Sequence, residues 1–143
     1  MKWMFLPYRR YFDFSGRSRR LEYWMYTLMN VIVAILFVVL IIAGMPWDEN
    51  MQMSQNSEMP GPLFWTGLGG LILFMLGSLI PGIAVTVRRF HDQDLSGWLY
   101  LLNFIPYIGG LVIFVFMCLD GTRGANRFGQ DTKDPRTEAD VFA

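Results

Sequence analysis

The 143-residue chain contains one cysteine, one histidine and few charged side chains. A single cysteine, Cys118, cannot form a disulfide bond within the chain, so disulfide-stabilised folds are excluded. One histidine without clustered cysteines does not supply the ligands of a usual catalytic zinc site. Charged residues are 17% of the chain, against about 25% in soluble domains, and this low fraction argues against a water-soluble fold.

Charge is missing altogether from three long stretches, residues 23–47, 59–87 and 95–119. An α-helix needs about 20 apolar residues to cross the hydrocarbon core of a bilayer, and each stretch is at least that long. The first stretch follows polar and aromatic residues and precedes no signal-peptidase motif, so it is expected to remain as an anchor helix. The composition therefore predicts an integral membrane protein.

Positive charge is concentrated on one predicted side of the membrane. Residues 1–22 contain six Lys or Arg, residues 48–62 contain only acidic charges, and the predicted loop 88–97 contains Arg88 and Arg89. Lys and Arg collect on the cytoplasmic side of membrane proteins. The N-terminus and the 88–97 loop are therefore expected in the cytoplasm, and the acidic loop is expected outside.

The third stretch contains helix-breaking residues near its middle, Pro106, Gly109 and Gly110. Two arrangements follow: a helical hairpin of residues 96–105 and 108–119 with both ends cytoplasmic, or a kinked spanning helix. We prefer the hairpin because it leaves every Lys and Arg on one side. The predicted fold class is an all-α membrane protein, a small bundle of two transmembrane helices plus this broken third apolar segment.

Residues 1–129 are predicted to form a single transmembrane domain. Residues 130–143 are polar and charged, and we expect a disordered cytoplasmic tail there. Within the second stretch, Gly70, Gly77 and Ala84 recur every seven residues. Small residues on one helix face favour close helix packing, and we prefer packing within the same chain to the alternative of a dimer face.

Charged and aromatic side chains gather in three segments beside the membrane, residues 11–24, 88–98 and 120–129. Such side chains favour anionic lipid headgroups, and opposite charges there can also pair with each other. The third segment is glycine-rich and could hold phosphate through its backbone, but it lacks the spacing and lysine of a P-loop. The candidate interfacial cluster comprises Arg17, Arg20, Glu22, Arg88, Arg89, His91, Asp92, Asp120 and Arg127.

His91 and Asp92 have the chemistry of an oriented general base or of metal ligands. Catalysis would need a nucleophile or further ligands, and the sequence has no second histidine and no clustered cysteine. We therefore predict no catalytic residue, no metal and no cofactor. The pair is expected to belong to an ion-pair network that fixes the positions of the helices.

Together the three segments resemble the bacterial inner-membrane proteins of the domain-of-unknown-function 805 family. The motifs that carry the resemblance are YFDFSGRSRRLEYW at 11–24, VRRFHD at 87–92, SGW at 96–98, GT at 121–122, Gly124 and NRFG at 126–129. The resemblance covers about residues 11 to 131. It implies an inner-membrane location and this architecture, without an established activity or a catalytic residue.

Several functions remain open. A non-enzymatic membrane module that packs with or regulates an envelope protein partner is favoured, since the sequence has no credible catalytic nucleophile, metal set or nucleotide motif. The alternative is a small transporter or lipid-binding protein that uses the broken segment and the Arg-rich cytoplasmic edge. A lipid-headgroup enzyme centred on His91 is a third possibility. The expected partners are the lipid bilayer, anionic headgroups and a membrane protein, and no nucleic acid is expected.

Overall fold

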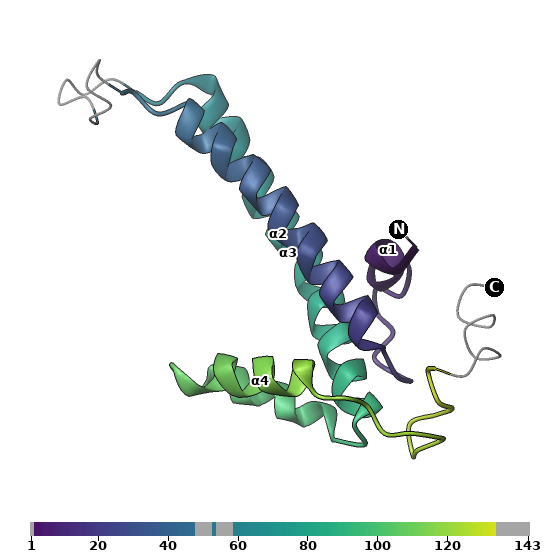
Figure 1. Ribbon diagram of the computed structural model, residues 1–143. Coiled ribbons are helices and arrows are strands. Elements are labelled where there is room, and N and C mark those ends of the chain that lie inside the picture. Colours follow the sequence, from purple (N-terminus) through teal and green to yellow (C-terminus); the bar gives the residue numbers. More distant parts are fainter. Residues whose placement is uncertain (1, 48–52, 54–58, 134–143) are drawn as a thin grey trace. The chain divides into compact units, whose positions relative to one another are not determined.

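The computed structural model describes residues 2–47, 53 and 59–133. Over these residues the secondary structure is helical, and the elements in chain order are α1 (Lys2–Arg9), α2 (Arg20–Ala43), α3 (Pro62–Asp92), the 3₁₀ helix η1 (Gly97–Phe104) and α4 (Ile108–Cys118) (Figure 1). The acidic residues of the predicted outer loop, Asp48, Glu49 and Glu58, lie outside the described residues, as do residues 134–143 of the predicted tail.

Helices α2 and α3 are long and apolar enough to cross a membrane. They contain 24 and 31 residues, and at about 1.5 Å per residue both exceed a hydrocarbon core of about 30 Å. Large apolar side chains are exposed along both helices, for example Ile35, Leu36, Leu73 and Leu76. Exposed apolar surface of this extent suits lipid, so the predicted all-α membrane class with two long apolar helices is confirmed.

The chain divides into two compact units, and the first to be described contains residues 28–78. In it α2 and α3 run side by side (Figure 1). A Cβ atom on Gly44 would overlap the backbone of Phe64, and a Cβ on Gly70 would overlap the ring of Phe37. These glycines therefore allow a close approach of the two helices within the chain.

The other unit contains residues 1–27 and the chain from residue 79 onward, including the broken third stretch. Here η1 and α4 lie side by side as a helical hairpin (Figure 1). Gly109 allows this packing, because a Cβ there would overlap the carbonyl group of Leu102. Tyr107 lies at the tip, fully exposed, with a φ of 65°. Of the two arrangements expected for this stretch, the structure has the hairpin.

A small apolar core holds the hairpin in place. Phe90 of α3 is buried together with Ile113 and Met117 of α4. On the α2 side, the rings of Trp24 and Phe114 meet edge to face with centroids 5.7 Å apart. The hairpin is thus anchored through α4 to the end of α3 and the beginning of α2.

Two features differ from the sequence expectations. The predicted loop 88–97 is wrong in its first half, because α3 continues through Arg88 and Arg89 to Asp92. Charged residues usually end an apolar helix, but these arginines are buried beside carboxylates, which lets the helix continue. The sequence does not predict α1 either, since eight residues containing a proline carry too short a pattern.

Candidate functional site

The cluster is built on a buried ion pair between two helices. Arg88 Nη2 of α3 lies 3.1 Å from Glu22 Oε1 of α2, and both side chains are almost completely buried. The segment that precedes α2 is held against the end of α3, because Ser18 N donates a hydrogen bond to the Arg88 carbonyl at 3.1 Å. Charges removed from water need close partners, so the beginning of α2 and the end of α3 are locked together.

Asp92 compensates two buried arginines. Arg17 Nε donates to Asp92 Oδ1 at 2.9 Å, and Arg89 Nη1 donates to Asp92 Oδ2. Thr132 Oγ1 donates to Asp92 Oδ1 at 3.2 Å, and Thr122 N donates to the Asp92 carbonyl at 2.8 Å. This one residue therefore joins the segment before α2, the end of α3 and the segment after α4.

The glycine-rich segment wraps around Arg17. Arg17 Nη1 donates to the Gly124 carbonyl at 2.7 Å, and Nη2 donates to the Thr122 carbonyl at 2.6 Å. Gly124 has a φ of 79°, and a Cβ on Gly121 would overlap the Asp92 carboxylate. The segment presents carbonyl oxygens to a cation. A phosphate cradle needs N–H groups instead, so the backbone does not form the cradle that its glycines suggest.

His91 is oriented by groups other than a carboxylate. Its Nδ1 lies 3.2 Å from the Gly16 carbonyl, and its ring stacks on Phe128 with centroids 3.9 Å apart. The His91 carbonyl accepts from Asn126 Nδ2 at 2.9 Å. A carbonyl oxygen can only accept a hydrogen bond, so in this contact His91 Nδ1 is the donor and carries the proton. The Asp92 carboxylate contacts arginines, so the His–Asp pair that would orient a general base is not formed.

Arg20, Asp120 and Arg127 lie at the exposed edge. Arg20 Nη2 is 2.7 Å from Asp120 Oδ1, and Lys133 Nζ is 3.2 Å from the same oxygen. The hydrogen bond from Lys133 is the main cause of a lowered pKa of Asp120, and Arg20 adds to it. Arg127 pairs instead with Asp94, at 3.2 Å. The structure thus brings Arg20 and Asp120 together, while Arg127 pairs outside the predicted set.

A local ion pair between two residues three apart in the chain was not predicted from the sequence. Arg10 Nη2 lies 2.7 Å from Asp13 Oδ2, and the other Asp13 oxygen accepts from Ser15 N at 3.0 Å. Partial burial opposes the charge of Asp13, but the hydrogen bonds from Ser15 and Arg10 outweigh it and lower its pKa to about 2. The spacing of Asp13 and Ser15 is the signal of an Asx turn that could have found this feature.

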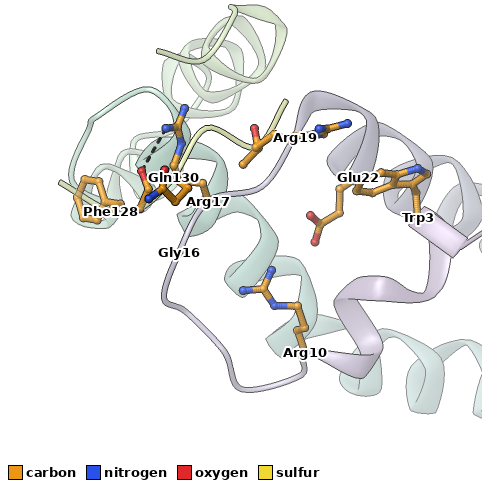
Figure 2. A pocket seen from close by; sticks show the side chains of 10 residues that line it. Trp3, Arg10, Gly16, Arg17, Arg19, Glu22, Phe128 and Gln130 are labelled. Carbon is orange, nitrogen blue, oxygen red and sulfur yellow. Dashed lines mark hydrogen bonds between the residues drawn. The ribbon is translucent and has the colours of Figure 1, made fainter. Parts of the chain in front are cut away.

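A cavity of about 250 Å³ lies beside α1 (Figure 2). Figure 2 shows the Arg10 guanidinium and the Glu22 carboxylate pointing toward the same space. The Arg19 guanidinium carbon lies 5.5 Å from the centre of the Trp3 ring. Glu22 is already paired with Arg88, and Arg10 with Asp13. These charged groups that line the cavity therefore have partners within the chain.

A larger cavity of about 620 Å³ opens beside the beginning of α2. We call it the cationic cavity, and its charged lining comprises Arg19, Arg20, Arg89, Lys133, Asp92 and Asp120. Leu21 and Trp24 supply an apolar wall. Among the described residues, no group of three or more His, Cys, Asp or Glu side chains could hold a metal ion. In this cavity four cationic and two acidic side chains therefore lie beside an apolar surface.

Comparison with known proteins gives relatives along nearly the whole chain. The family model described as "Protein of unknown function (DUF805)" matches residues 11–130. The Escherichia coli K12 inner membrane protein YhaI is 41% identical over 134 residues, which are 93% of this chain and 97% of the relative. Inner membrane protein YhaH of the same strain is 40% identical over 133 residues, 93% and 98% of the two chains. No solved structure matches the chain.

Proposed function

Because this chain belongs to the DUF805 family of proteins of unknown function, we propose that it is a non-enzymatic module of the bacterial inner membrane that binds anionic lipid at its cytoplasmic edge. The relatives named above are inner membrane proteins, and the two long apolar helices fit the same location. A protein in this location contacts lipid, and we propose that its charged cluster gives it a preference for anionic lipids.

The proposal includes a topology with α2 and α3 crossing the membrane and the N-terminus in the cytoplasm. Helix α4 has 11 residues, a length of about 16 Å, which is too short to cross a core of about 30 Å. Packed beside η1, it returns to the side from which the hairpin entered. All three charged segments then share one face, which the excess of Lys and Arg makes cytoplasmic.

One observation carries the preference for anionic lipid: arginines and lysine outnumber carboxylates at this edge. Asp92 is shared by Arg17 and Arg89. Asp120 is likewise shared by Arg20 and Lys133. Positive charge left over at a membrane surface attracts anionic headgroups, by about 1 kcal/mol for each Lys or Arg.

The geometry gives less support to the other functions. Ion-coupled transport usually uses a charged residue inside the membrane, and neither residues 23–43 nor residues 62–87 contain one. An enzyme would need a base next to a nucleophile, whereas His91 is held by Gly16 and Phe128. Packing with an envelope protein stays a prediction from the sequence, since no surface among the described residues argues for a particular partner.

The test is the lipid that stays with the protein. The full chain is purified in mild detergent, and the phospholipids that remain are compared with those of the source membrane. We expect anionic phospholipid to be enriched over phosphatidylethanolamine, and the enrichment to fall at high salt because exposed charges are screened. Lipids retained in bulk proportion, together with a stoichiometric protein partner, would support the partner module instead.

A further inference from the structure

We propose that the cationic cavity is a saturable site for the phosphate of one anionic phospholipid. The inference rests on the proposed lipid function and narrows it to one cavity, one ligand group and one binding stoichiometry. Three parts of the lining favour this ligand: a buried arginine at the base, exposed cations at the rim, and the apolar wall.

The base of the cavity is Arg89, whose side chain is completely buried. Its Nη1 donates to Asp92 and its Nη2 to the Leu119 carbonyl. Its Nε has no hydrogen-bond partner among the described residues. A buried charged group with an unused N–H is costly, and Asp92 is already engaged by Arg17. The positive charge of Arg89, only partly compensated, therefore lies beneath the cavity and attracts an anion bound there.

At the rim of the cavity, two cationic side chains share one carboxylate as their ion-pair partner. Arg20 and Lys133 both contact Asp120 Oδ1, at 2.7 and 3.2 Å. Arg20 Nη1 also donates to the Cys118 carbonyl at 3.1 Å. The side chains of Arg20 and Lys133 are 44% and 63% exposed, so they can turn toward a ligand without unfolding the chain. Guanidinium and ammonium groups are the side chains that bind phosphate best.

The apolar wall of the cavity favours a lipid over a soluble phosphate compound. Leu21 is half exposed, and Trp24 packs edge-on against Phe114. Both lie on the first turns of α2, where the uncharged stretch begins at residue 23. A phosphate bound by the cations would therefore leave its glycerol and acyl chains along the apolar surface of α2. A free phosphate would not use this wall, and it would fill only a small part of about 620 Å³.

Native mass spectrometry of the full chain in detergent tests the site. The probe is dioleoyl phosphatidylglycerol, and phosphatidylethanolamine with the same acyl chains is the reference. We expect one phosphatidylglycerol to bind saturably. The double variant Arg20→Gln/Lys133→Gln should weaken this binding roughly tenfold or more, given the attraction per cation near an anionic surface. Thermal unfolding checks that the variant remains folded.

A matched control removes the same charge elsewhere. Arg9→Gln/Arg123→Gln alters two exposed arginines that do not line the cationic cavity, and it should leave the bound lipid in place. Equal weakening in both double variants would overturn the site and leave a diffuse preference for anionic lipid, as the proposed function alone requires. No preference for phosphatidylglycerol in the unmodified chain would overturn both proposals.

A third arm separates lipid from soluble phosphate. Glycerol 3-phosphate and inorganic phosphate are added in competition with phosphatidylglycerol. We expect millimolar concentrations to displace little lipid, since neither compound contacts Leu21 or Trp24. Displacement at concentrations equal to that of the lipid would overturn the lipid assignment and make the cavity a site for a soluble phosphate compound.

Discussion

Arg88 and Glu22 are 66 residues apart in the chain, yet Arg88 Nη2 lies 3.1 Å from Glu22 Oε1 with both side chains almost completely removed from solvent. The pair stands where α2 begins and α3 ends. A buried charge whose partner is removed keeps its desolvation cost and loses its compensation. The pair is therefore a point at which one substitution should have a large effect.

Replacing Glu22 by glutamine should strongly destabilise the protein. Arg88 would stay buried without a compensating charge, at a cost of roughly 3–5 kcal/mol. Asp94→Asn is the control, because Asp94 makes an exposed pair with Arg127 and such pairs contribute about 1 kcal/mol or less. Thermal unfolding in detergent measures both. Similar losses for the two variants would show that the buried pair has no special role.

Asp92→Asn should cost much more stability than His91→Phe. Asp92 compensates Arg17 and Arg89, whereas phenylalanine at position 91 keeps the stacking on Phe128 and loses only the hydrogen bond to Gly16. That hydrogen bond is worth about 1 kcal/mol. Abundance in membranes and thermal unfolding report the difference. A His91→Phe protein of normal abundance that has lost its cellular phenotype would instead point to an active or binding site at the membrane interface.

Gly109 and Gly110 should differ sharply when replaced by alanine. A Cβ on Gly109 would overlap the Leu102 carbonyl, while a Cβ on Gly110 meets nothing within 4 Å. We expect Gly109→Ala to lower stability by about 1–3 kcal/mol through overpacking. Gly110→Ala should be neutral or stabilising, because alanine favours helix. Thermal unfolding of the two proteins decides, and equal behaviour would contradict a closely packed hairpin.

A reporter fused after Ala143 should be found in the cytoplasm. In the proposed topology the hairpin returns the chain to the side where it entered, and Arg123, Arg127 and Lys133 then share a face with the N-terminus. A green fluorescent protein fusion should fluoresce, and an alkaline phosphatase fusion should be inactive. Active phosphatase with a dark fluorescent fusion would place this terminus outside and reject the topology.

Asp13 should contribute to stability in a defined acid range. Its pKa is lowered from 3.8 to about 2 in the folded protein, so its contribution is present above about pH 4 and is lost as the pH falls toward 2. Asp13→Asn should remove this part of the pH dependence. Unfolding curves of both proteins between pH 2 and 6 test it, and parallel curves would mean that Asp13 titrates normally.

Much of the architecture follows from local sequence. Uncharged stretches of sufficient length predict α2 and α3, because lipid selects helices with apolar surfaces. Pro106 likewise predicts an interruption of the third stretch, because proline removes a hydrogen bond of the helix, although the local pattern left the hairpin and a kinked spanning helix both open. These properties depend on neighbours in the chain, so no knowledge of distant contacts is needed.

The arrangement of the charged cluster was decided only in three dimensions. The residue types predict ion pairing at the membrane edge, but they do not predict which partners meet. Asp92 pairs with Arg17 and Arg89, and the His91 ring stacks on Phe128. The glycines near residue 124 suggest a phosphate cradle, and their carbonyls face Arg17 instead. Charges attract without regard to sequence separation, so the choice of partner follows from which segments the packing of α2, α3 and α4 brings within reach.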